Sequence, residues 1–102
     1  MIIYTDETSF EKTLNQKDLC LVDFFATWCG PCRMLNEELI KLDKEADLLI
    51  VKVDIDECSN LTDDFKIDAV PTMYLFKAGK PVKQLQGYKT KVELLETIKE
   101  YL

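Results

Sequence analysis

The sequence predicts an α/β fold in which a mixed sheet is covered by helices. Nearly continuous apolar runs at Cys20–Ala26 and Leu48–Asp54 have the composition of strands that are buried on both faces. Between and after these runs, apolar residues recur with the period of a helix. A chain of 102 residues has the size of one domain, so we expect a single domain over residues 1–102.

The composition excludes several classes of function. Thirteen basic and 19 acidic residues give a net charge of −6, which argues against binding to nucleic acid or to an anionic membrane surface. There is no histidine to act as a catalyst or metal ligand. No apolar run approaches the roughly 20 residues that span a bilayer. The N-terminus lacks the pattern of a signal peptide, and four cysteines in such a chain suggest a reducing compartment, so we expect a cytoplasmic location.

The first elements in chain order are a short strand and a helix. Ile2–Tyr4 is a strand candidate. Thr5 or Asp6 can cap a helix whose apolar face holds Phe10 and Leu14. A polar loop then leads into the first of the two buried strands.

The stretch Trp28-Cys29-Gly30-Pro31-Cys32 follows that strand and leads into a helical pattern. Two cysteines at this spacing can form a disulfide, bind a metal or simply fill space. At the start of a helix the free N–H groups and the positive end of the dipole stabilise a thiolate, the species that attacks disulfides. We therefore expect Cys29 to be reactive near neutral pH. Pro31 suits an early helical position, and Gly30 leaves room for a partner chain beside the sulfur.

The helix after this motif is expected to run from Pro31 to about Ala46. Its apolar face consists of three leucines: Leu35, Leu39 and Leu42. Glu37 and Lys41 form an i,i+4 pair on the other side. This helix should therefore bury its leucine face against the sheet.

The second buried strand contains a lone lysine, Lys52, a residue that normally lies at an edge or reaches to water. Ser59 can cap a short helix through Leu61 and Phe65. Met73–Phe76 then has the composition of another strand.

A hairpin and a helix end the chain. Ala78–Lys80 is a turn, and Pro81–Gln86 is the last strand, at a sheet edge where proline is tolerated. Thr90 and Glu93 form a capping box. The terminal helix is expected to bury a face made of four residues: Val92, Leu95, Ile98 and Leu102.

Four segments carry a resemblance to a known family: Val22-Asp23-Phe24, Trp28-Cys29-Gly30-Pro31-Cys32, Val70-Pro71-Thr72 and Phe76-Lys77-x-Gly79. The chain resembles the thioredoxin family over essentially all of its length. The resemblance implies the thioredoxin fold, a central mixed five-stranded sheet flanked by four helices, with parallel crossovers first and an antiparallel hairpin last. The Gly-Pro pair between the cysteines favours a reductant over an oxidant or an isomerase.

Asp23 interrupts the first buried strand, where a carboxylate is seldom found without a partner. From the residues alone, it could lie at an edge or in a local salt bridge. The resemblance implies instead a buried acid that assists the proton transfers of Cys32, with Lys52 beside it. Burial is expected to raise the pKa of this acid toward the range that is useful for acid–base catalysis.

The Val70–Pro71 bond is expected from the resemblance to be cis and to face Cys29. A proline in front of a strand is otherwise only a strand-start residue. In the family, this arrangement leaves the backbone at the position of Val70 free to pair with an incoming chain.

Two further residues are expected near the active site. We expect Trp28 to be an exposed contact for partners, against the alternative that it packs in the core. We expect Gly87 to permit close approach of the chain near the active site.

The resemblance implies a protein-disulfide reductase that cycles between the dithiol and the disulfide of Cys29 and Cys32. Cys29 attacks a substrate disulfide and Cys32 resolves the mixed disulfide, with Asp23 taking up its proton. The expected partners are disulfide-containing proteins and an NADPH-dependent thioredoxin reductase. We expect a monomer with no bound cofactor. The alternative is a binding subunit that holds polypeptide at the same surface without turnover.

Cys20 and Cys58 stand apart at no recognisable metal spacing, whereas structural zinc needs four ligands, so we expect no metal site. Cys20 should pack as a small apolar residue. Cys58 is expected near the surface, either as a tolerated thiol or as a regulatory cysteine such as some animal-type thioredoxins carry.

Two residues depart from the family pattern. Glu37 replaces the usual helix proline, which predicts a straighter helix. Phe25 replaces a tryptophan that is common in bacterial thioredoxins.

Overall fold

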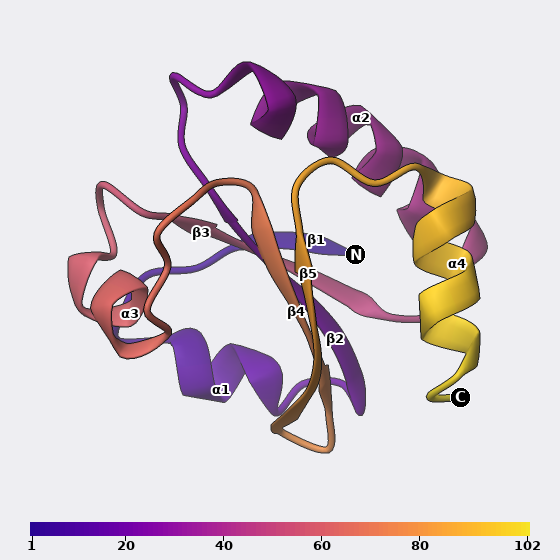
Figure 1. The fold of residues 1–102 in the computed structure, drawn as a ribbon. Helices are drawn as coiled ribbons and strands as arrows, with labels where there is room; N and C mark the ends of the chain where they lie inside the picture. Colours follow the sequence, from indigo (N-terminus) through magenta and orange to yellow (C-terminus); the bar gives the residue numbers. More distant parts are fainter.

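A five-stranded sheet lies at the centre of the computed structural model, which describes residues 1–102 (Figure 1). The elements in chain order are β1 (Ile2–Tyr4), α1 (Phe10–Leu14), β2 (Leu19–Phe25), α2 (Gly30–Glu45), β3 (Leu49–Asp54), α3 (Ser59–Asp64), β4 (Thr72–Lys77), β5 (Lys80–Gln86) and α4 (Lys91–Lys99). All the strands and helices expected from the sequence are present, and the largest difference is at the start of α1.

The strands are ordered β1-β3-β2-β4-β5 across the sheet. β3 pairs in parallel with β1 and β2, whereas β4 is antiparallel to both β2 and β5. The expected mixed five-stranded sheet with four helices is therefore confirmed. Because β2 lies in the middle and helices cover both of its faces, its residues from Leu19 to Phe24 are all buried.

Helices cover both faces of the sheet (Figure 1), and an apolar core lies under the helices on each face. α2 and α4 cover one face, where the leucines of α2 pack with Leu21 of β2 and Ile50 of β3. α1 and α3 cover the other face, where the rings of Phe10 and Phe24 pack against Phe65. None of the helices is long and apolar enough to cross a membrane.

The alternation of side chains along β2 and β3 decides where their two charged residues point. Successive residues of a strand face opposite sides of the sheet. Asp23 lies two residues after Leu21, and Lys52 two residues after Ile50, so both point to the face that α2 covers. Asp23 and Lys52 are also register partners on neighbouring strands. The sheet therefore brings this carboxylate and this ammonium together.

The starts of α1 and α3 differ from the expectation. α1 begins after Ser9, and Asp6 instead accepts the Ser9 N–H at 2.9 Å in the turn before the helix. Ser59 is the first residue of α3 and not its cap. An N–H in the first turn of α3 donates to the carboxylate of Glu7. The Glu7 side chain, far away in the sequence, thus satisfies a free N–H at the start of α3. No local sequence pattern predicts this contact.

The buried face of α4 also differs from the expectation. Leu94 and Ile98 are buried in the core, whereas Val92 and Leu102 are exposed. The expected capping box is present. The last segment holds more apolar residues than one face can take, so a helical period fits more than one face. Packing against α2 decides between them.

The expected pair between Glu37 and Lys41 is not formed. Lys41 Nζ instead lies 2.9 Å from Glu38 Oε2. The other oxygen of Glu38 accepts the backbone N–H of Lys91 at 2.9 Å. Glu38 thus contacts Lys41 within α2, and its hydrogen bond with Lys91 joins α2 to the start of α4.

Leu39→Ala is expected to lower the free energy of unfolding by about 2–5 kcal/mol. Leu39 is fully buried between α2 and the sheet, so truncation removes apolar contacts and leaves a cavity. Its neighbour Ile40 is 43% exposed, so Ile40→Ala should cost less than about 1 kcal/mol. Urea unfolding of both variants at neutral pH measures the difference, and equal losses would contradict it.

Candidate active site

The two cysteines of the Trp28–Cys32 motif lie where β2 ends and α2 begins (Figure 1). Cys29 has an extended backbone and caps α2, and its Sγ accepts the backbone N–H of Cys32 at 3.1 Å. The two residues form a disulfide with Cα atoms 5.2 Å apart. After reduction, the same N–H and the positive end of the helix dipole stabilise a thiolate on Cys29. The position of Cys29 therefore favours its reactivity.

The segment around Val70 and Pro71 forms the wall opposite Cys29. The Val70–Pro71 bond is cis, as expected, and the Val70 carbonyl oxygen lies 3.8 Å from Cys29 Sγ. Pro71 O accepts the backbone N–H of Gly87 at 2.8 Å, which joins the end of β5 to the same wall. Cys29 is only 6% exposed, and its sulfur lies beside this backbone edge.

Gly87 contributes to this wall through its backbone conformation. Its φ of +82° lies in the left-handed region, which favours glycine. No atom of the chain lies within 4 Å of the place that a Cβ would take, so space inside the protein does not require glycine here. Close approach of a partner to Gly87 stays a prediction.

Trp28, next to Cys29, forms the exposed rim of the surface around the cysteines. Its side chain is 67% exposed, which contradicts the alternative that it packs in the core. The indole N–H donates to Asp56 Oδ2 at 2.9 Å, which fixes the ring relative to the turn after β3. Asp56 was not expected to take part, because an acidic turn gives no sign of its partner.

Asp23 and Lys52 form a buried ion pair on the face of the sheet that α2 covers. Lys52 Nζ lies 2.8 Å from Asp23 Oδ2, and both side chains are almost completely inaccessible. Burial raises the pKa of the Asp23 carboxyl, and the Lys52 ammonium lowers it only in part. Asp23 therefore keeps a proton to higher pH than an ordinary aspartate.

A cavity of about 490 Å³ is lined by the second cysteine and by Lys52 of this pair. Its lining includes Cys32 and Asn36 of α2, Phe25 of β2 and Lys52 of β3, and several exposed residues through which water can enter. Lys52 Nζ donates to Asn36 Oδ1 at 3.0 Å. Asn36 was not expected here, although its spacing of four from Cys32 places both on one face of α2.

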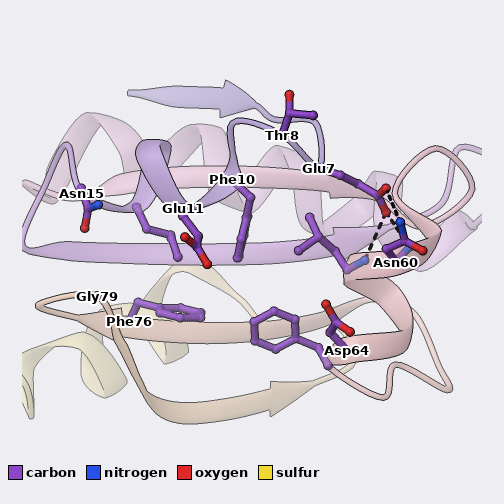
Figure 2. A pocket seen from close by; sticks show the side chains of 12 residues that line it. Glu7, Thr8, Phe10, Glu11, Asn15, Asn60, Asp64, Phe76 and Gly79 are labelled. Carbon is purple, nitrogen blue, oxygen red and sulfur yellow. Dashed lines mark hydrogen bonds between the residues drawn. The ribbon is translucent and has the colours of Figure 1, made fainter.

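A second and larger cavity lies away from the cysteines, between α1 and α3 (Figure 2). Its volume is about 640 Å³, and its lining includes the rings of Phe10 and Phe76 and the carboxylate of Asp64. Glu7 accepts a hydrogen bond from the side chain of Asn60 at 3.1 Å at one end. No cysteine lines this cavity, so it is separate from the redox site.

The expectation that Cys58 lies near the surface is wrong. It precedes α3, and the packing of α3 on the sheet turns its side chain into the core, where Sγ lies 3.8 Å from Thr5 O. Burial, with nearby acidic residues, raises the pKa of this thiol, which makes it a poor nucleophile, and we propose no regulatory role for it. Cys20 packs in the core as expected. No three histidine, cysteine or acidic residues are grouped so that they could hold a metal ion.

A known protein family matches almost the whole chain: the sequence model of the family described as Thioredoxin covers residues 1–100. The chain belongs to the thioredoxin family. It is 39% identical over 105 residues to a thioredoxin of Mycolicibacterium smegmatis, across 99% of this chain and 94% of that protein. A mutant thioredoxin from Halobacterium salinarum has a similar structure, with a TM-score of 0.93 and 32% identity over 98% of this chain and 89% of that one.

A longer relative contains a thioredoxin as one part. The chain is 38% identical over 98 residues to the "Bifunctional thioredoxin reductase/thioredoxin" of Mycobacterium leprae. This match covers 94% of the chain but only 21% of that protein. The remainder of the longer protein has no counterpart in these 102 residues.

Proteins of the thioredoxin family are thiol–disulfide oxidoreductases, and this chain has the same function. The family carries no prosthetic cofactor. Its redox-active group is a pair of cysteines, here Cys29 and Cys32. The resemblance and the thiol–disulfide chemistry expected from the sequence are thus confirmed.

Asp23→Asn is expected to raise the free energy of unfolding at neutral and alkaline pH. Because the pKa of Asp23 is higher in the folded than in the unfolded chain, folding disfavours the ionised form. This penalty is absent below about pH 4 and grows as the pH rises through the folded-state pKa. Urea unfolding over a pH series measures the effect. A gain that is confined to acidic pH would contradict the raised pKa.

Proposed function

We propose that this protein is a cytoplasmic protein-disulfide reductase, an electron carrier that an NADPH-dependent thioredoxin reductase re-reduces. Residues 1–102 act as one domain and as a monomer. One observation carries the proposal: Cys29 lies at the start of α2 beside the Val70 carbonyl, where a thiolate is stabilised next to a backbone edge that a polypeptide can use.

The proposed cycle is thiol–disulfide exchange. The Cys29 thiolate attacks one sulfur of a substrate disulfide, which forms a mixed disulfide and releases the other substrate sulfur as a thiolate. Cys32 then loses its proton and attacks Cys29 Sγ, which releases the second substrate thiolate and closes the Cys29–Cys32 bond. Two electrons pass to the substrate. Because the cysteines are three residues apart, the second attack is intramolecular and fast.

Asp23 is proposed as the acceptor of the Cys32 proton, with Lys52 as the neighbour that adjusts its pKa. The raised pKa of Asp23 supports this role, because a general base works best when its pKa is near the operating pH. The cavity lined by Cys32 and Lys52 supports a transfer through water.

Substrate polypeptide is proposed to bind along the wall beside Cys29. The Val70 backbone would pair with an extended segment, a mode that tolerates varied sequences. Trp28 supplies an exposed aromatic side chain at the rim of this surface, which the substrate would contact. Beside the sulfur, a Cβ added to Gly30 would meet nothing closer than 3.9 Å, which leaves space for the substrate. Gly87 would border the far end of this surface.

A thioredoxin reductase is proposed as the electron donor. The Mycobacterium leprae relative is named as both a thioredoxin reductase and a thioredoxin in one chain. That name supports a reductase as the partner of the present chain.

Cys29→Ser is expected to lower NADPH-coupled reduction of insulin disulfides to the background of the reductase alone, because the attacking sulfur is lost. Cys32→Ser should also stop turnover but accumulate a mixed disulfide with the substrate, visible by mass spectrometry without reductant. Cys58→Ala is the matched control, since that thiol is buried outside the cycle, and it should keep near-normal activity.

Turnover by the Cys29→Ser variant would contradict the cycle. If the unchanged protein bound polypeptide but gave no turnover with several reductases, the result would favour a binding subunit of the same fold.

Trp28→Ala is expected to lower the second-order rate constant for insulin reduction about five- to tenfold, because it removes an apolar contact from the rim. Reduction of a small aromatic disulfide, which does not need the extended surface, should change less than about twofold. Single-turnover reactions of the pre-reduced protein measure both rates without the reductase. Equal losses for the two substrates would argue against a docking role.

A further inference from the structure

We propose that Arg33 is a specificity-determining residue of the redox site: its guanidinium binds an acidic side chain that flanks the disulfide of a protein substrate. The inference deepens the proposed function and rests on it in one respect, that polypeptide disulfides are reduced at Cys29. The place of the guanidinium, its free donors and the charges around it carry the rest.

The Arg33 side chain is held beside the start of α2. Arg33 is the only arginine of the chain, and it directly follows Cys32 in the first turn of the helix. Helical side chains lean toward the N-terminal end of their helix. Arg33 Nη1 donates to the Thr27 carbonyl at 3.2 Å, in the segment that leads from β2 to the cysteines. This hydrogen bond keeps the guanidinium next to the redox motif.

The guanidinium borders the space that is proposed for the substrate beside Gly30. Outside the local backbone, Arg33 Nη2 is the only atom within 4 Å of the place that a Cβ on Gly30 would take, and it lies 3.9 Å away. Gly30 lies between the two cysteines. A substrate segment that fills this space therefore has the guanidinium at its edge, close to the reacting sulfurs.

Most donors of Arg33 are free to bind a ligand. A guanidinium carries five N–H donors on a planar fork that matches the two oxygens of a carboxylate. One nitrogen donates to Thr27, and Arg33 is exposed and takes part in no ion pair. Glu37 lies one helical turn further along α2 and lines the same cavity, but the guanidinium is turned toward Thr27 instead. The charge of Arg33 is thus uncompensated by the protein itself.

The other charged groups of this region leave Arg33 as the cation that a substrate can reach. The Lys52 ammonium is buried and paired with Asp23. Asp56 adds a negative charge on the side of Trp28, whose indole N–H it accepts at 2.9 Å. With a net charge of −6, most of the protein surface repels an acidic substrate. A fixed cation at the rim therefore orients such a substrate, with its carboxylate toward Arg33 and away from Asp56.

Single-turnover reduction of synthetic peptides by the pre-reduced protein tests the proposal without a reductase. Three peptides carry one disulfide each and differ only in the residues that flank its cysteines, which are glutamates, glutamines or lysines. At low ionic strength, Arg33→Gln is expected to slow the glutamate peptide about two- to fivefold relative to the unchanged protein. The glutamine peptide should change less than about 1.5-fold, and the lysine peptide should react no more slowly. Added salt should reduce the loss, because it screens exposed charges.

The comparison between peptides separates recognition from other effects of the substitution. A change in the reactivity of the Cys29 thiolate would act equally on all three peptides. Glutamine is a good helix former, so α2 should be kept in Arg33→Gln. Lys80→Gln is the matched control: it removes one positive charge at the exposed turn between β4 and β5, at the end of the sheet where β2 begins and the cysteines do not lie. This control should slow the glutamate peptide less than about 1.5-fold.

A loss in Arg33→Gln that is equal for the glutamate and glutamine peptides would overturn the inference. The same holds for an equal loss of the glutamate peptide in Lys80→Gln. If the unchanged protein reduced none of the three peptides, the proposed function itself would fail, which is a distinct result.

Discussion

Strand β2 is buried on both faces, and this constraint sets the environment of every group placed on it. A carboxylate there loses its water on all sides, and the charge that compensates it is Lys52 on the neighbouring strand. That charge offsets only part of the dehydration, so the remainder appears as a higher proton affinity of Asp23. The same burial that makes β2 the centre of the core thus raises the pKa of Asp23, as its proposed role as a proton acceptor requires.

The pairing of β2 with β4 and β5 assembles the rest of the site from distant parts of the chain. Thr72 pairs with Phe24 near the end of β2, and Gln86 pairs with Thr72. Pro71 and Gly87, the residues next to these pairs, therefore lie at the end of the sheet where β2 leads to the cysteines, and Val70 beside Pro71 faces Cys29. The two cysteines consequently have different surroundings: one meets a backbone edge, and the other meets a cavity. This difference fits the separate roles in attack and in resolution that we propose for them.

The sequence by itself determined the elements, their order and the place of the redox motif. These features depend on local patterns: continuous apolar strands, the leucine face of α2, the capping box at Thr90 and the turn at Ala78–Lys80. The thiolate-stabilising position of Cys29 also follows locally, because a strand that leads into a helix through a Cys-Gly-Pro-Cys stretch leaves few alternatives. The acid at Asp23 stood out because a charge interrupts an apolar run.

Only the tertiary structure decided which element each side chain meets. In the folded chain the Cys58 side chain lies in the core, and packing fixes which face of α4 is buried. Glu7 accepts an N–H at the start of α3, and Asn36 accepts a hydrogen bond from Lys52. In each case the sequence pattern is compatible with more than one arrangement. The choice came from contacts with a segment far away in the chain, whose position is set by the sheet register and by the packing of the helices on it.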